Sequence, residues 1–146
     1  MSVEDNLEVM RRINQAWNER DWKTFDRLHA EDVAVVFTHP EGVTGRDPHR
    51  EEAQNFIAAF PDHQIRFPHK LLFGRGDMIC SVHRSIGTHT GDWKMPDGSV
   101  IPPTGKKMEI EMVTVVKVQD GQLVEETLYF DNLSVMKHLG LALREV

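Results

Sequence analysis

The chain has 146 residues, of which 40% are hydrophobic and 27% are charged, and its formal net charge is -6 at pH 7. This length suits a single domain over residues 1–146, and the composition is that of a globular chain rather than a disordered one. The acidic balance argues against a nucleic-acid partner and against binding to an anionic membrane surface.

The sequence also indicates a compartment. The acidic start, Met1 to Asp5, lacks the basic and apolar segments of a signal peptide, and no run of about eighteen apolar residues is present to span a membrane. Cys80 is the single cysteine, so no internal disulfide can form. We therefore expect a cytoplasmic protein with no membrane partner.

The first part of the chain has the periodicity of helices. Ser2 and Asp5 form a capping-box pattern ahead of apolar residues at helical spacing, which predicts a helix over 3–20. A short second helix is predicted over 22–28, and a third over 48–60, where an aspartate and a proline begin it and a second proline ends it. Between the second and third helices, the β-branched and apolar segment from Val33 to Phe37 predicts a short buried strand.

From His63 onward the pattern changes to that of strands. A hairpin signal, Asp120-Gly121, joins the last two of them. The predicted strands cover 63–73 with a break at Pro68, 78–89, 106–118 and 122–131. A final short helix opens at Asn132 and ends at Gly140. Helices followed by antiparallel strands indicate the α+β class.

The segment 112–116 is apolar on both faces of its predicted strand. One face must cover the interior of the domain, and the other must be covered too. We expect a second copy of the chain to cover it, which predicts a homodimer through the outside of the sheet.

Asp131 ends the last predicted strand, where the chain turns into the final helix. It either caps that helix or serves as a functional carboxylate, and its neighbour Asn132 can cap equally well. Asp131 shares its strand face with Thr127 and Tyr129. If that face lines a dry interior, the pKa of Asp131 is raised, as a general acid/base near neutral pH requires. We therefore expect Asp131 to be catalytic, with Thr127 and Tyr129 contacting the ligand.

His83 and His89 lie on one face of a predicted strand, but roughly 20 Å apart, so they cannot share a metal ion. Neither has another ligand at metal-binding spacing, and we expect no metal. His89 stands between Gly87 and Gly91, which let a ligand approach the backbone closely. His89 is therefore a second catalytic candidate, the alternative being a polar residue that merely ends the strand.

Three further residues are candidates for substrate binding. Glu111 alternates with apolar residues, which usually means a solvated face, although a pocket carboxylate is the alternative. Trp17 either packs in the core of the first helix or lines a pocket, and His39 follows the first strand at its rim. The chain has no glycine-rich phosphate loop, no nucleophile elbow and no Cys/His cluster, so the expected chemistry is proton transfer without a cofactor.

Several segments resemble one protein family in the same order along the chain. They are Phe60-Pro61-Asp62, Gly87-Thr88-His89-Thr90-Gly91, Pro102-Pro103-Thr104-Gly105-Lys106, Asp120-Gly121 with Val124-Glu125, and Asp131 followed by Leu139-Gly140. The chain resembles the SnoaL-like polyketide cyclases, also called ester cyclases, of the nuclear transport factor 2-like and ketosteroid-isomerase-like superfamily.

The resemblance implies a cone: a curved antiparallel β-sheet wrapped around N-terminal helices, in the cystatin-like or nuclear transport factor 2-like arrangement. In characterised cyclases of the group, an aspartate is the acid/base of an intramolecular aldol ring closure, without metal or cofactor. Asp131 occupies the matching position, and His89 matches a family histidine that contacts the ligand. The implied ligand is an apolar or aromatic molecule that carries carbonyl groups.

The chain departs from the family in three places. Thr127 stands where a tryptophan is frequent, His138 replaces a glutamine, and the loop over 92–100 is longer. These differences alter side chains near the pocket and its lid, so the resemblance does not identify the substrate.

Three functions therefore compete. The first is a cofactor-independent cyclase or isomerase with Asp131 as its acid/base. The second is a non-catalytic small-molecule-binding protein of the same fold, since fold does not decide function. The third is a dimerisation domain with a filled interior.

Overall fold

The computed structural model describes residues 1–36 and 42–141 of the chain. Within this part the helices are α1 (Val3–Glu19), α2 (Trp22–Leu28), α3 (Arg46–Ala59) and α4 (Asn132–Leu139). None of them is both long and apolar enough to cross a membrane.

The main sheet contains the strands β1 (His29–Val36), β2 (Val43–Thr44), β3 (Gln64–Ile65), β4 (Leu71–Arg75), β5 (Met78–Thr88), β8 (Lys107–Gln119) and β9 (Gln122–Phe130). Their order is β2-β1-β9-β8-β5-β3, and β4 also pairs with β5. The sheet is antiparallel as expected except where β1 runs parallel to β9. A separate hairpin of β6 (Trp93–Lys94) and β7 (Val100–Ile101) lies in the connection between β5 and β8.

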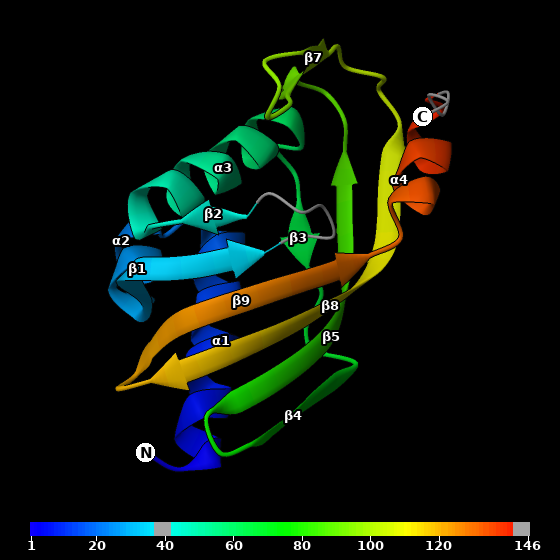
Figure 1. Cartoon of the computed structure of the whole chain (residues 1–146). Coiled ribbons are helices and arrows are strands. Elements are labelled where there is room, and N and C mark those ends of the chain that lie inside the picture. Colours follow the sequence, from blue (N-terminus) through cyan, green and yellow to red (C-terminus); the bar gives the residue numbers. More distant parts are fainter. Residues whose placement is uncertain (37–41, 142–146) are drawn as a thin grey trace.

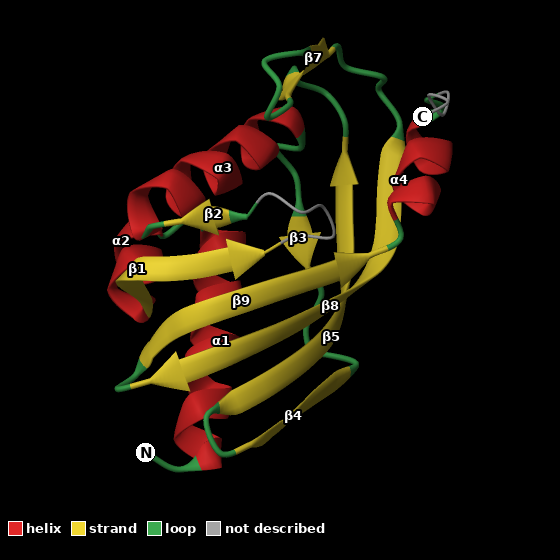
Figure 2. Ribbon diagram, viewed as in Figure 1, coloured by secondary structure: helices red, strands yellow, loops and turns green. Residues whose placement is uncertain are grey.

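The sheet is curved and open, and the helices α1 to α3 lie on its concave side (Figures 1 and 2). The long strands β5 and β8 pair over their full length and bend together, so that the sheet wraps around α1. This is the α+β cone that the sequence predicts.

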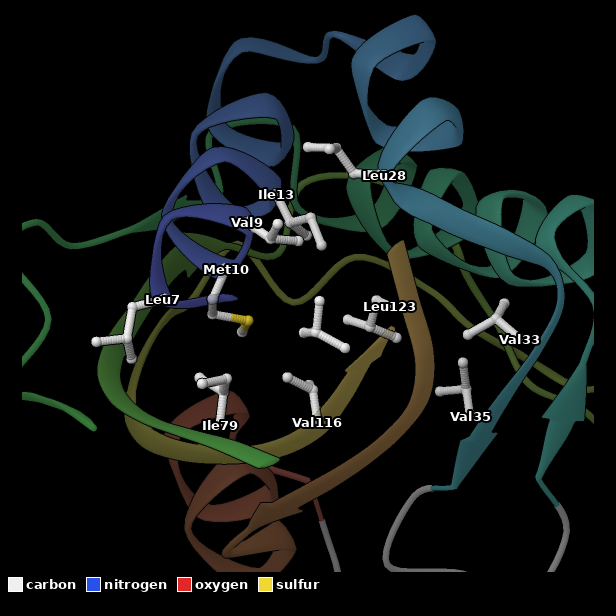
Figure 3. Packing of buried hydrophobic residues seen from close by; sticks show 11 residues of the cluster. Leu7, Val9, Met10, Ile13, Leu28, Val33, Val35, Ile79, Val116 and Leu123 are labelled. Atoms are coloured by element: carbon white, nitrogen blue, oxygen red, sulfur yellow. The ribbon is translucent and has the colours of Figure 1, made fainter. Parts of the chain in front are cut away.

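The core between α1 and the sheet is apolar. Leu7, Met10 and Ile13 of α1 point toward Ile79 of β5 and Val116 of β8 (Figure 3). A second apolar cluster fills the other end of the cone, where α4 packs against β8 and the end of α3. The two clusters fix the sheet against the helices, so that the polar side chains between them have defined positions.

Local signals set most of the helix ends. The Ser2–Asp5 capping box is present, Asp21 caps α2, and Gly140 ends α4 with a left-handed φ of 68°. The start of α3 differs from the prediction, because its N-cap is Gly45 and not Asp47. Gly45 has a φ of 107°, a conformation that glycine adopts readily, so the chain turns into the helix two residues earlier.

One extra residue decides which side chains of β9 face inward. Lys117 of β8 pairs with Glu125, whereas the next residue, Val118, pairs with Leu123, so Val124 forms a β-bulge. Because side chains alternate along a strand, the bulge exchanges the two faces beyond it. The inward residues after the bulge are Glu126, Leu128 and Phe130, and the outward ones are Glu125, Thr127 and Tyr129.

Candidate active site in the cone

Polar side chains gather on the inner face of the sheet, between the two apolar clusters. Buried residues of this kind are Ser81, His83 and Ser85 on β5 and Thr114 on β8. Glu126 of β9 joins them from the other side of β8, because the bulge turns it inward. Buried polar groups cost folding free energy unless they are paired, so each needs a partner within the cone.

The partner of Glu126 is His49, which α3 places above the sheet. His49 Nε2 lies 3.5 Å from Glu126 Oε2, and 12% of the Glu126 side chain remains exposed. Burial alone would lower the pKa of His49, but its contacts with Glu126 and Glu52 outweigh burial and raise that pKa to about 9. Burial would raise the pKa of Glu126, yet the pairing with His49 leaves it below its usual value. The pair is therefore an imidazolium beside a carboxylate at neutral pH.

His29, the first residue of β1, completes this cluster. It is fully buried, and its Nδ1 lies 2.6 Å from the carbonyl oxygen of Phe25. Since a carbonyl only accepts, Nδ1 carries the proton and Nε2 has a free lone pair, for which the described residues provide no partner. Burial, followed by the charge of His49, lowers the pKa of His29 to about 4 and keeps the ring neutral.

The residues His29, His49 and Glu126 are also of the types that hold metal ions. Each offers one ligand atom, and these atoms lie within 4.8 Å of one another. Ligands of a single zinc ion are bound at about 2.0–2.2 Å, which requires a tighter group than this one. The three side chains would have to move together to hold an ion, whereas the His49–Glu126 pair already balances its charges.

A second polar group contains Trp17, His63 and Ser85. The indole Nε1 of Trp17 donates to His63 Nδ1 at 2.8 Å, and His63 Nε2 is hydrogen-bonded to the Ser85 hydroxyl. Nδ1 must accept, so Nε2 carries the proton and donates to Ser85. His63 thus cannot take the proton of Ser85, and these residues are not a nucleophilic serine and its base.

Apolar side chains surround the polar cluster on the inward side. Leu128 packs with one apolar cluster, and Phe56, Met112 and Phe130 pack with the other, yet all of them remain partly exposed. Trp17 contacts Phe56 with ring centroids 6.1 Å apart and belongs to the same lining. The combination is a mainly apolar wall with a few convergent ionisable groups, as in sites for small organic molecules.

The expectation that Asp131 faces a dry interior with a raised pKa is wrong. Asp131 is the N-cap of α4, and it accepts hydrogen bonds from the backbone N–H of Ser134 at 3.2 Å and from its hydroxyl at 2.8 Å. It is exposed, and the hydrogen bonds from Ser134 lower its pKa. Asn132 does not take the cap but begins the helix. The cause of the error is the bulge at Val124, which turns the face shared with Thr127 and Tyr129 outward.

His89 is buried directly after the end of β5, and the described residues provide no hydrogen-bond partner for its Nε2. Its ring stacks on Phe60 with centroids 5.1 Å apart and meets Trp93 edge-on. Nδ1 lies 3.1 Å from the Thr104 hydroxyl and 3.3 Å from the Thr104 backbone nitrogen. These contacts tie the loop that carries the β6–β7 hairpin to β5.

The remaining candidates separate into two groups. Trp17 packs against Phe25 and Ala53 and contacts Phe56 inside the cone. Glu111 lies on the outer face and forms an ion pair with Lys70 at 2.8 Å, so the solvated interpretation fits it. Tyr129 and Thr127 also face outward, and Tyr129 is 52% exposed. His39 lies outside the residues that the structure describes.

None of the sequence signals pointed to His29 or His49, because only the fold brings them to Glu126.

Comparison with known proteins agrees with this architecture. The family model of the SnoaL-like polyketide cyclases matches residues 7–139. A candidate SnoaL-like polyketide cyclase from Jannaschia sp. CCS1 superposes with a TM-score of 0.83 at 19% identity, over 96% of this chain and 94% of that one. IdmH, a candidate polyketide cyclase from Streptomyces antibioticus, gives 0.76 at 25% identity, over 93% and 99% of the two chains.

AclR, a candidate hydroxylase from Streptomyces galilaeus, is similar to the same extent. Its TM-score is 0.77 at 19% identity, over 95% of this chain and 98% of that one. No curated protein matches the chain in sequence. The fold expected from the resemblance is confirmed, and proteins of that fold carry more than one named activity.

Proposed function

Because this chain belongs to the SnoaL-like polyketide cyclase family, we propose that it is a small-molecule enzyme that closes a ring or shifts a double bond in a carbonyl compound. Its substrate is an apolar or aromatic molecule held inside the cone. Glu126 is the base and His49 the acid of this reaction, which requires no cofactor.

The observation that supports this proposal is the Glu126–His49 pair in an apolar surrounding. At neutral pH the pairing keeps Glu126 ionised, so that it can accept a proton, and His49 protonated, so that it can donate one. The charged form of each is maintained by the other, at a separation of 3.5 Å between Nε2 and Oε2. The Glu126 side chain is 12% exposed, and the proposal requires a reacting carbon to reach its carboxylate from within the cone.

The proposed reaction conserves protons. The Glu126 carboxylate takes a proton from the carbon next to a carbonyl, and the electron pair of that C–H bond becomes an enolate. The enolate carbon attacks a second carbonyl of the same molecule, forming the new C–C bond. His49 then donates its proton to the resulting alkoxide, and the proton on Glu126 returns to His49. Apolar walls strengthen each of these electrostatic interactions.

A second assignment of the base keeps Asp131, as the family resemblance implies. Asp131 follows β9 directly, at the end of the cone where Phe130 is partly exposed. The two assignments differ in the variants that they make inactive, so parallel substitutions separate them.

The test is turnover of a panel of aromatic polyketones and lactones by wild type, Glu126→Gln and Asp131→Asn, with product formation followed by mass spectrometry. We expect Glu126→Gln to lower kcat by roughly 10²–10⁴-fold at nearly constant ligand affinity. Loss of activity in Asp131→Asn alone would transfer the role of base to Asp131. Binding of panel members without reaction in wild type would favour the second candidate function, a non-catalytic binding protein.

The outer face of the sheet supports the homodimer. Paired residues on four strands form a row across it, namely Leu71, Val82, Val113 and Tyr129, and Phe73 and Val115 lie in the next row. We call these six residues the outer apolar patch. Phe73 is 55% exposed and Tyr129 52%. In the described part of the chain, α1 to α3 lie on the inner face, so a second copy is the proposed cover of the outer face. The single cysteine fits a cytoplasmic location.

A further inference from the structure

His49 faces a carboxylate at each of its two ring nitrogens. Nε2 lies 3.5 Å from the buried Glu126, and Nδ1 lies 3.8 Å from Oε1 of Glu52. Glu52 is one turn further along α3, at the i+3 position, and 34% of its side chain is exposed. The imidazole therefore stands between an inner carboxylate on the sheet and an outer carboxylate that reaches solvent.

Two other rings lie beside the ring of His49. His29 is neutral and lies to one side, with ring centroids 5.2 Å apart. Phe25 contacts the ring face at a centroid distance of 5.4 Å and offers no polar atom. Among the described residues, Nδ1 is buried without a hydrogen-bond partner, so the Glu52 carboxylate is its nearest charge.

We infer that Glu52 is the positioning residue of this site: its carboxylate holds the outer nitrogen of His49, so that the inner nitrogen points at Glu126. Substrate does not contact Glu52. Its charge stabilises the imidazolium, and its attraction for Nδ1 prevents the ring from turning away from Glu126. The inference rests on the proposed function for the consequence in catalysis, whereas the effect on His49 itself can be measured without a substrate.

The structure provides matched variants for the test. Glu52→Gln removes the charge at nearly constant shape, and Glu52→Asp keeps the charge. Glu51→Gln changes the charge of the exposed neighbour on the same helix. Side-chain ¹⁵N NMR of histidine-labelled protein reports the titration of His49 in each variant. We expect Glu52→Gln to lower the His49 pKa by about one unit, Glu52→Asp to restore much of it, and Glu51→Gln to leave it unchanged.

Turnover provides the second measurement. With any substrate found in the panel, Glu52→Gln should lower kcat by roughly tenfold at nearly constant KM, because the acid is displaced while the binding walls remain. A His49 titration that is the same in Glu52→Gln and wild type would overturn the inference. If Glu126→Gln stays fully active, the proposed base is wrong, yet the NMR titration still decides the role of Glu52.

Discussion

The indole N–H of Trp17 donates to Nδ1 of His63 over 2.8 Å, linking α1 to the segment that follows α3. This bond fixes the His63 tautomer, because an indole nitrogen can only donate. It also turns the protonated Nε2 toward Ser85 on the sheet. The bond from Trp17 thus sets the direction of the bond between His63 and Ser85. Removing the Trp17 donor tests how much this pair of bonds contributes to the free energy of unfolding.

Substituting Trp17 by Phe should destabilise the protein. The ring contacts with Phe56 and Trp22 largely survive, but Nδ1 of His63 becomes a buried acceptor without a donor, at a cost of about 1–3 kcal/mol. Urea denaturation of Trp17→Phe measures this loss. The control is Trp22→Phe, which makes a similar change in the neighbouring ring that contacts Trp17 at 6.3 Å. Equal losses in the two variants would mean that ring volume, and not the hydrogen bond, matters.

Acid should destabilise the protein through His63 before most carboxylates are protonated. Burial, followed by the charge of Arg20, lowers the pKa of His63 to about 3 from an unfolded value near 6.5. The unfolded chain binds the proton first, so the free energy of unfolding is undiminished above pH 6.5 and falls as the pH drops toward 3. Each such group contributes up to about 1.4 kcal/mol per pH unit.

His63→Gln isolates this contribution, because glutamine can accept from Trp17 and donate to Ser85 without titrating. The unfolding free energy of this variant should fall less steeply between pH 6.5 and 4.5 than that of wild type. His29 and His83, whose pKa values burial lowers to about 4, titrate in both proteins and cancel in the comparison. His138→Gln, a change on the exposed side of α4, is the control. Identical slopes in His63→Gln and wild type would contradict the prediction.

Asp131 should contribute to stability as a helix cap. Asp131→Ala removes both hydrogen bonds with Ser134 and is expected to cost about 1 kcal/mol, whereas Asp131→Asn keeps an acceptor and costs less. Thermal and urea unfolding of the two variants gives the comparison. The same pair of proteins serves the activity test, since a folded Asp131→Asn variant shows whether the charge has any further role.

The outer apolar patch should hold two chains together. A charge at Tyr129, introduced as Tyr129→Glu, lies in the row that crosses four strands and should split the dimer into chains of 16.8 kDa. Sedimentation velocity over a range of concentrations measures the mass. Leu133→Glu places the same charge at another exposed apolar residue, on α4 outside the sheet, and should leave the dimer intact. A monomeric wild type at all concentrations would refute the dimer.

Removal of metal should leave the protein unchanged. The ligand atoms of His29, His49 and Glu126 lie within 4.8 Å of one another, but the carboxylates of Glu126 and Glu52 beside His49 already balance its charge. The melting temperature should therefore be the same before and after dialysis against EDTA, and purified protein should contain far less than one metal ion per chain. Stoichiometric zinc that is lost in His29→Gln would assign the cluster to a metal after all.

Local patterns in the sequence predict the elements of this fold well. The Ser2–Asp5 capping box, the Asp120-Gly121 hairpin and the Gly140 helix end act within a few residues of themselves, so the sequence alone reveals them. The parallel pairing of β1 with β9 joins segments about a hundred residues apart, and no local signal marks it.

The sequence predicts the candidate site less well, because the site too depends on contacts between distant segments. A regular strand starting at Leu123 would turn Asp131, Tyr129 and Thr127 inward, which is the alternation that the sequence suggests. The bulge at Val124 reverses it, and Glu126 faces the cone instead of its neighbour Glu125. His49 is equally inconspicuous in sequence, because a helix that packs over β1, and not any motif, brings it to Glu126.

The buried imidazoles and carboxylate also limit how heat-resistant this molecule can be. Charged or polar groups inside a protein are often replaceable by apolar residues of similar size with a gain in thermal tolerance. A library that varies the cone interior and is selected only for survival at high temperature should therefore drift toward leucine and methionine at these positions. The variants that withstand the most heat would be those that have lost the ion pair between Glu126 and His49.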